Sequence, residues 1–275
     1  MERVEAERIL RDVAASSGRP IDIAGAALAL ASFDRPRVAM DRYRRHLADL
    51  ASDVGRAAGG SEKLSDRLDA LNTTLVVQYG YVGDNLNYDD LQNANLMRVI
   101  DRRRGLPVAL GILYIHVARA QGWPISGLAF PGHFLLRLDG SDARLVIDPF
   151  HGGTPLEPHN LRDMLKTMTG NDAELQPEHY ASVSDRDILL RLQNNIKLRL
   201  VQQNNAEGAS AVVDRMLMMA PEEAALWRES GLLNAKAGRL QAAIDAIEQF
   251  LTFDVGQTAR HEAAALLQQM RDRLN

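Results

Sequence analysis

Apolar residues recur at helical spacing in the first part of this chain. Residues 1–58 are expected to form helices, with Arg19-Pro20 ending the first segment and an alanine- and leucine-rich second segment at Ile21–Ala31. A third helix is expected after Asp34, its candidate N-cap, with Pro36 in its first turn. The apolar stripe of this third helix consists of Val38, Tyr43, Leu47, Leu50 and Val54.

The middle of the chain contains one helix that is apolar on all sides and three strand-like runs. Leu106–Ala120 has few polar positions, which is typical of a helix buried all round, and Pro107 suits its first turn. The strand-like runs, rich in apolar and β-branched residues, are Ile125–Phe130, His133–Leu138 and Arg144–Asp148. This order predicts an α+β core with an antiparallel sheet.

From about Ser184 to the end the pattern is helical again and contains an internal repeat. Trp227, Gly231, Gly238 and Ala243 have the spacing of a tetratricopeptide repeat, in which small residues let two antiparallel helices approach closely. The corresponding residues of a weaker copy, 34 positions earlier, are Gln193, Lys197, Asn204 and Ala209. We therefore expect three regions, namely a helical region at 1–58, an α+β core at 59–180 and an all-α tetratricopeptide-like region at 181–275.

The composition narrows the classes of function. The chain has 275 residues and no cysteine, which excludes disulfides, thiolate metal ligands and a thiol nucleophile. Its net charge of −4 gives no overall attraction to nucleic acid or to an anionic membrane. The N-terminal segment has no signal-like apolar run, and no run approaches the ~20 apolar residues that span a bilayer. We expect a soluble, cytoplasmic protein.

His133 and Asp148 are the strongest candidates for chemistry. If residues 139–142 form a four-residue turn, His133 lies directly opposite Asp148, and Arg137 lies opposite Arg144. Opposed side chains have Cβ atoms about 5 Å apart, which permits an imidazole–carboxylate hydrogen bond. Such a bond fixes the histidine tautomer and makes the other ring nitrogen more basic. Because no thiol nucleophile is available, a polar tie between strands is favoured over catalysis.

Two other groups of residues are weaker candidates. A metal site would combine His133, Asp148, His151 and His159, but this spacing matches no common ligand motif, so we predict no metal and no other cofactor. The basic run at 102–104 is typical of a solvated helix end, and nucleic acid is therefore not an expected partner.

Several segments resemble the SirB-type family, in which a transglutaminase-like domain precedes tetratricopeptide-like helices. The matching segments are DIAGAALALA, YGYVGDNLNY, the asparagine at Asn93, VIDRRRGLPVALGILYIHVA, PGHFLLRL, IDPFHGG and SGLLNAKAG. The resemblance implies a papain-like α+β core, a bacterial and cytoplasmic protein, and a role linked by name to gene regulation. It places the catalytic cysteine of the wider superfamily at Pro107, the histidine at His133 and the acid at Asp148.

Proline at the nucleophile position implies that the thiol mechanism of the superfamily is lost. The neighbouring residues 108–111 supply no nucleophile either. If Pro107 does occupy the lost cysteine site, Pro107→Cys should create a thiol that faces His133 and reacts rapidly at pH 6.

We therefore expect a non-catalytic interaction module with a regulatory role. A peptide or protein partner would bind in the remnant cleft beside His133, Asp148 and the 81–95 loop, and along the C-terminal helices. The candidate binding residues, taken from the matching segments, are Tyr88, Asn93, Arg104 and Phe134. The alternative is a hydrolase in which His133 and Asp148 activate water, with or without a metal ion. The sequence leaves the oligomeric state open.

Overall fold

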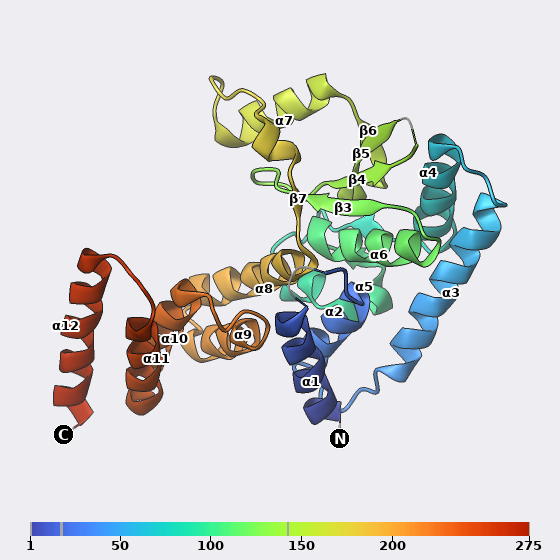
Figure 1. Cartoon of the computed structure of the whole chain (residues 1–275). Coiled ribbons are helices and arrows are strands. Elements are labelled where there is room, and N and C mark those ends of the chain that lie inside the picture. Colours follow the sequence, from blue (N-terminus) through green and yellow to red (C-terminus); the bar gives the residue numbers. More distant parts are fainter. Residues whose placement is uncertain (1, 17–18, 142, 275) are drawn as a thin grey trace. The chain divides into compact units, whose positions relative to one another are not determined.

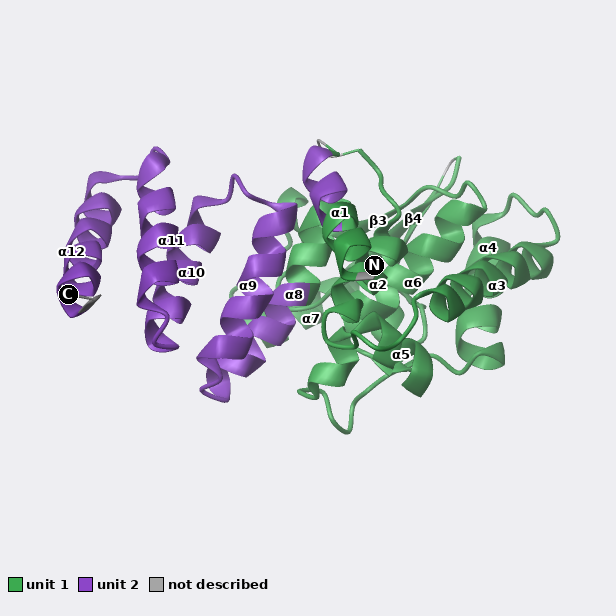
Figure 2. Cartoon of the chain, turned by 90° about the horizontal axis from the view of Figure 1, so that it is seen from below, with its two compact units in different colours: residues 1–9, 16–192 green, residues 10–15, 193–275 purple. Residues whose placement is uncertain are grey.

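The chain folds into a helical N-terminal region, an antiparallel-sheet core and an all-helical C-terminal region, which confirms the expected fold class (Figure 1). The structure is a computed structural model that describes residues 2–16, 19–141 and 143–274. Two compact units are present, one containing residues 1–9 and 16–192 and the other residues 10–15 and 193–275 (Figure 2). The division into regions 1–58, 59–180 and 181–275 remains a prediction.

Six α-helices precede the five-stranded sheet in the sequence. With the short helical turns between them, they are α1 (Glu2–Ala15), α2 (Ile23–Ser32), α3 (Asp41–Ala58), α4 (Leu64–Asn72), the π-helical turn η1 (Thr73–Gln78), the 3-10 turn η2 (Leu91–Ala94), α5 (Leu96–Arg102) and α6 (Pro107–Ala120). The predicted N-cap at Asp34 is wrong, because α3 begins seven residues later. The Asp34 N–H instead donates to the carbonyl of Ala31, so this segment continues as a turn from the end of α2.

The strands form one parallel pair and one antiparallel sheet. The parallel pair is β1 (Val82–Gly83) with β2 (Arg104–Gly105). The antiparallel sheet has the order β6-β5-β4-β3-β7. Its strands are β3 (Ile125–Leu128), β4 (Leu136–Asp139), β5 (Arg144–Asp148), β6 (Thr154–Leu156) and β7 (Ser182–Val183). The helical elements between β5 and β7 are η3 (Pro149–His151), α7 (Pro158–Thr169) and η4 (Pro177–Tyr180).

The register of β4 against β5 differs from the predicted one by two residues. Arg137 pairs with Val146 instead of Arg144, and its guanidinium binds the carboxylate of Asp139 at 3.0 Å. The loop closes one residue later than predicted, because Gly140 N–H donates to the carbonyl of Ala143; Asp142, which the predicted turn included, lies outside the described residues. Because an even shift leaves every side chain on its face of the sheet, the expected grouping of side chains is kept.

Helix α6 is the centre of the core of the first unit. All of its residues except His116, Arg119 and Ala120 are buried, as its all-round apolar pattern predicts. It contacts α2, α3, α4 and α5 and also β3, beside which it lies in Figure 1. Gly111 permits the approach to the sheet, since a Cβ at this position would overlap the ring of Phe134.

A separate, smaller apolar cluster forms where α7 packs. Its buried members are Leu128, Phe130, Leu135, Leu161 and Leu165. In β4 and the residues just before it, Leu135 therefore belongs to this cluster while Phe134 packs against α6, so the sheet residues alternate between two apolar environments.

The C-terminal helices are α8 (Asp185–Gln202), α9 (Ala206–Met219), α10 (Ala224–Lys236), α11 (Leu240–Thr252) and α12 (Gln257–Leu274). The two predicted repeats have the same turn. Each contains a left-handed residue, Asn204 with φ 57° and Gly238 with φ 77°. The next residue in each turn donates its N–H to the carbonyl five positions earlier, at 2.8 Å and 2.9 Å respectively. The degenerate copy therefore keeps the backbone geometry that its sequence only weakly indicates.

Candidate functional site

Asp148, the last residue of β5, organises the turn that follows it. Its Oδ1 accepts hydrogen bonds from the backbone N–H groups of Phe150 at 2.9 Å and His151 at 3.4 Å, so the side chain caps the 3-10 turn η3. Pro149, at the first position of this turn, needs no N–H partner there. The Asp-Pro sequence thus fixes both the turn and the orientation of the carboxylate.

The other carboxylate oxygen of Asp148 binds two imidazoles. Its Oδ2 accepts from His133 Nε2 at 3.0 Å and from His151 Nδ1 at 2.7 Å. The side chains of Asp148, His133 and His151 are 2%, 10% and 58% exposed, so the cluster extends from the interior to the surface. The predicted bond between His133 and Asp148 is therefore present, although His133 precedes β4 and does not lie directly opposite Asp148.

The second histidine is the member of the cluster that the hairpin argument missed. His151 reaches Asp148 because η3 turns the chain back within three residues. The alternation of side chains along a strand does not predict such a turn. Its ring stacks on that of His133 with 6.2 Å between centroids, and the edge of Phe150 lies against both rings. The sequence signal that could have found it is the Asp-Pro-x-His spacing of a capped turn.

The two histidines determine the charge state of Asp148. Burial alone would raise the pKa of Asp148, but the hydrogen bond and charge of His133, followed by those of His151, hold the pKa below its usual range. Asp148 is therefore an ionised acceptor at neutral pH. Because the carboxylate has no proton to donate, Nε2 of His133 and Nδ1 of His151 carry the hydrogens of these bonds. Nδ1 of His133 and Nε2 of His151 are then the nitrogens that can accept a proton.

A second layer of polar side chains supports the turn from α4 and α6. Asn72 donates from Nδ2 to the carbonyl of Gly153 at 3.2 Å, and Tyr114 donates its hydroxyl hydrogen to Asn72 Oδ1 at 3.0 Å. Burial, together with the charge of Asp148, raises the pKa of Tyr114 above its usual value. Gly153 has φ 71° and no room for a Cβ beside Asn72 and Tyr114, so glycine is required here.

Pro107 is the first residue of α6 and is buried. Helix α6 contacts η3, the turn that carries His151. The preceding residue, Leu106, is tied to the 81–95 loop through its N–H, which donates to the carbonyl of Asn93 at 2.9 Å. With no cysteine in the whole sequence, the cluster has an acid and two bases but no thiol.

The 81–95 loop is held in place by the buried carboxylate of Asp84. Asp84 accepts hydrogen bonds from the Asn87 N–H at 3.1 Å and from Arg102 at 3.1 Å, and Arg102 also donates to Asn93 Oδ1 at 3.0 Å. Burial would raise the pKa of Asp84, but hydrogen bonds from the Asn87 N–H and the Asn93 side chain, with the charges of Arg102 and Arg104, hold the pKa below its usual range. A loop rich in Asn and Asp, exposed over residues 85–89, is thereby anchored to the core at both ends, a role that the sequence did not predict.

The four predicted binding residues divide into two exposed and two buried side chains. Tyr88 is 41% exposed and lies with its ring edge-on to Phe150, and the Arg104 side chain is 46% exposed. Asn93 is fully buried, and Phe134 is buried against α6 with the guanidinium of Arg191 above its ring. Their roles in binding remain predictions; the two buried side chains would act through the packing that they support.

Most of the basic run at 102–104 is engaged inside the protein. Arg102 binds Asp84, and the guanidinium of Arg103 lies 4.8 Å from the centre of the Tyr81 ring and 2.7 Å from His46 Nε2. Burial and the charge of Arg103 lower the pKa of His46, which therefore accepts this hydrogen bond as a neutral ring. The prediction of a solvated helix end is therefore wrong for Arg102 and Arg103, which these contacts hold, and fits only Arg104, whose side chain is 46% exposed.

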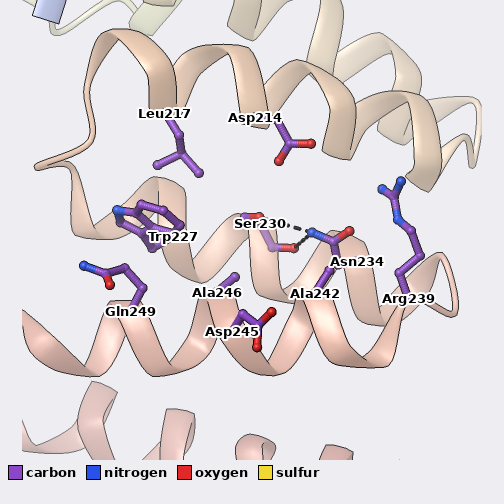
Figure 3. A pocket seen from close by; sticks show the side chains of 10 residues that line it. All are labelled: Asp214, Leu217, Trp227, Ser230, Asn234, Arg239, Ala242, Asp245, Ala246 and Gln249. Atoms are coloured by element: carbon purple, nitrogen blue, oxygen red, sulfur yellow. Dashed lines mark hydrogen bonds between the residues drawn. The ribbon is translucent and has the colours of Figure 1, made fainter. Parts of the chain in front are cut away.

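The second unit contains an open groove on its repeat helices. The groove has a volume of about 570 Å³, and its lining comes from α9, α10 and α11 (Figure 3). Asp214 lies on the α9 side, Asp245 on the α11 side and Arg239 near one end, with Trp227 at the other. Ser230 and Asn234 form a hydrogen-bonded pair on the α10 floor. The groove thus combines an aromatic surface with carboxylates on both walls.

Comparisons with known proteins agree with this architecture. Residues 41–194 match the model of the transglutaminase-like superfamily, and residues 196–275 match the model of the tetratricopeptide repeat. A UPF0162 protein from Xylella fastidiosa (strain Temecula1) is 33% identical over 191 residues, which cover 67% of each chain. A UPF0162 protein from Vibrio cholerae is 28% identical over 232 residues, covering 84% of this chain and 86% of its own.

The protein SirB1 of Salmonella typhimurium is 28% identical over 142 residues, covering 51% of this chain and 52% of its own. No solved structure shows significant similarity to the chain. Within the described residues, every helix is too short or too polar to cross a bilayer.

Proposed function

This chain belongs to the transglutaminase-like superfamily and to the UPF0162 family, and from that premise we propose that it is a non-catalytic module that binds a peptide or protein partner. The observation that carries the proposal is a superfamily histidine–acid pair retained in a chain that has no cysteine. The thiol mechanism requires a cysteine thiolate as nucleophile, and the first position of α6 holds Pro107 instead.

The tetratricopeptide region supplies the main surface for the partner. Its groove is lined by Trp227 and by polar and charged side chains of α9, α10 and α11. This combination suits an extended peptide segment that carries both apolar and polar side chains. Asp214 and Asp245 outnumber Arg239, so the groove favours a partner segment with a basic side chain. A second contact would form beside Tyr88, whose ring lies against Phe150 of the cluster turn, and beside the exposed Arg104, which lies near Asp84.

A cross-linking pull-down with the full-length protein tests this proposal. Wild type should capture a stoichiometric partner from a lysate of the source cells, and mass spectrometry should place the cross-links on α9–α11. Asp245→Lys should reduce capture at least about tenfold, since reversing a charge opposite a basic group costs more than ~1.4 kcal/mol. Asp254→Lys is the matched control, because Asp254 is exposed but does not line the groove.

Equal capture by wild type and Asp245→Lys would contradict the groove as the binding surface. Recovery of a small molecule with no protein partner, under several lysis conditions, would contradict the interaction module itself.

The second candidate function is hydrolysis of a substrate by water that the histidine cluster activates. The observation in its favour is the imidazole–carboxylate arrangement, in which Asp148 fixes the tautomers of His133 and His151. A hydrolase screen of wild type, His133→Ala and His151→Ala tests it. Activity that disappears in both variants would support an enzyme, whereas no turnover, or turnover that both variants retain, would reject this candidate.

A further inference from the structure

Three side chains from two separate segments bring one candidate ligand atom each within 4.8 Å of one another. We propose that His133, Asp148 and His151 form a binding site for a divalent transition-metal ion of the zinc type. Two imidazoles with one carboxylate are a ligand set that Zn²⁺ and its neighbours in the first transition row accept. This inference concerns the histidine cluster alone and does not depend on partner binding in the repeat groove.

The distances match the geometry that such an ion imposes. Zinc lies about 2.0–2.1 Å from its nitrogen and oxygen ligand atoms. At ligand–metal–ligand angles between the octahedral and the tetrahedral value, two such ligand atoms lie roughly 2.9–3.4 Å apart. Asp148 Oδ2 already lies 3.0 Å from His133 Nε2 and 2.7 Å from His151 Nδ1. All three ligand atoms lie within 4.8 Å of one another. An ion that replaces the hydrogens of these two bonds would thus require only small changes in the two oxygen–nitrogen distances.

The carboxylate is already oriented for a metal ion. Backbone N–H groups of Phe150 and His151 hold Oδ1, which leaves Oδ2 to face the imidazoles. Hydrogen bonds that fix a ligating carboxylate in this way increase metal affinity, since less ordering is required on binding. The turn that carries His151 is itself supported by the Asn72 bond to the carbonyl of Gly153.

Solvent can reach the site from one side. The His151 side chain is 58% exposed, whereas Asp148 and His133 are nearly buried, so the outer face of the ion would be open to water. Three protein ligands and one exchangeable position are the arrangement in which zinc binds water or a small anion. His159, the fourth residue considered from the sequence, is bonded to Asn160 on α7 and is not part of the cluster.

Metal titration of the full chain, after removal of metals with a chelator, tests the proposal. Zn²⁺ should bind with one ion per chain in calorimetry, and Co²⁺ should produce visible absorption bands typical of nitrogen and oxygen ligands. His151→Ala should weaken Zn²⁺ binding at least about 100-fold, the upper end of the loss seen when a supporting residue is removed. His159→Ala is the matched control and should bind as wild type does.

His151→Ala is the principal variant, because its exposed side chain can be removed without opening the core; circular dichroism should show an unchanged fold. Asp148→Asn and His133→Gln should weaken the Co²⁺ bands in the same way. Zn²⁺ binding that His151→Ala retains in full, or that His159→Ala also loses, would overturn the assignment. The assignment would also be overturned if the wild-type protein bound no ion at about 100 μM Zn²⁺, a concentration far above the dissociation constants of specific zinc sites.

Discussion

Asp148 combines a structural and a chemical role in one side chain. One oxygen caps the turn that follows β5, and the other gathers two imidazoles. Because these contacts favour the ionised form, they connect the stability of the protein to the charge of this residue.

Replacing Asp148 by asparagine should remove this contribution. We expect Asp148→Asn to lower the free energy of unfolding by about 1–3 kcal/mol at pH 7, since a buried, charge-assisted acceptor is lost. The native pKa of Asp148 is depressed, so the stabilisation is fully present above the unfolded-state pKa of about 3.9 and is lost as the pH falls through the native value.

Urea unfolding at pH 7 and near pH 3 measures the difference in the free energy of unfolding between wild type and Asp148→Asn. This difference should be smaller at the acidic pH. The exposed residue Asp163 provides the control variant Asp163→Asn, for which no such difference is expected. A difference that stays constant over this range would show that the charge of Asp148 does not contribute.

The burial of Pro107 changes the expected behaviour of an introduced thiol. Pro107→Cys should fold with a free energy of unfolding within about 1 kcal/mol of wild type, since the first helical position needs no N–H bond. The sequence suggests a rapidly reacting thiol at pH 6, but an apolar, buried position raises the pKa of a thiol and excludes reagents. We therefore expect slow alkylation by iodoacetamide in native protein and rapid alkylation in urea.

Ser65→Cys supplies the comparison for this experiment, because Ser65 is also in the first turn of a helix but is exposed. If Pro107→Cys reacts as fast as Ser65→Cys in the native state, the start of α6 opens to solvent.

At the scale of elements, patterns that depend on local spacing are predictable from the sequence. The all-round apolar run identifies α6, and small residues at repeat spacing identify α10 and α11. The β4–β5 register was missed by two residues because it depends on where the loop closes, at Gly140 and Ala143. The hydrogen bond of His151 to Asp148 and the role of Asp84 do not follow from the sequence pattern for a related reason: a capped turn and a buried loop carboxylate depend on local turns and on contacts between segments, which periodicity does not encode.

The contact between α10 and α11 gives a test of the repeat pattern. A Cβ at Gly231 would lie 2.5 Å from Cδ1 and 2.6 Å from Cγ1 of Ile247, a fully buried residue. Gly231→Ala should therefore lower the free energy of unfolding by about 1 kcal/mol, because overpacking exceeds the gain in helix propensity.

In an Ile247→Ala background the same change should be stabilising by about 1 kcal/mol, since space is available and alanine favours the helix. Thermal or urea unfolding of the four proteins in this cycle measures the coupling. Equal effects of Gly231→Ala in both backgrounds would mean that the two helices do not meet at this residue.

At the scale of the whole molecule, the two tryptophans report on different units. Trp123 belongs to the first unit, where the guanidinium of Arg67 lies 5.5 Å from its ring, and Trp227 belongs to the second, where its Nε1 donates to the carbonyl of Pro221. Each unit has its own apolar cluster, so unfolding of the chain need not be a single transition.

Variants with a single tryptophan should separate the two transitions in urea. The fluorescence of Trp227, measured in Trp123→Phe, should change at a lower urea concentration than that of Trp123, measured in Trp227→Phe, because the smaller unit buries a smaller fraction of its surface. Circular dichroism of both variants controls for effects of the substitutions. Coincident midpoints would show that the chain unfolds as one cooperative body.

The edges of the five-stranded sheet restrict how any partner can bind. The outer strands, β6 and β7, have only three and two residues, and Pro155 in the middle of β6 has no N–H to donate. Short and proline-containing edges resist the addition of a further strand, which also protects a sheet from self-association into aggregates. An extended peptide would find few backbone groups with which to pair here, so the partner binding proposed above would depend on side chains of helices and loops.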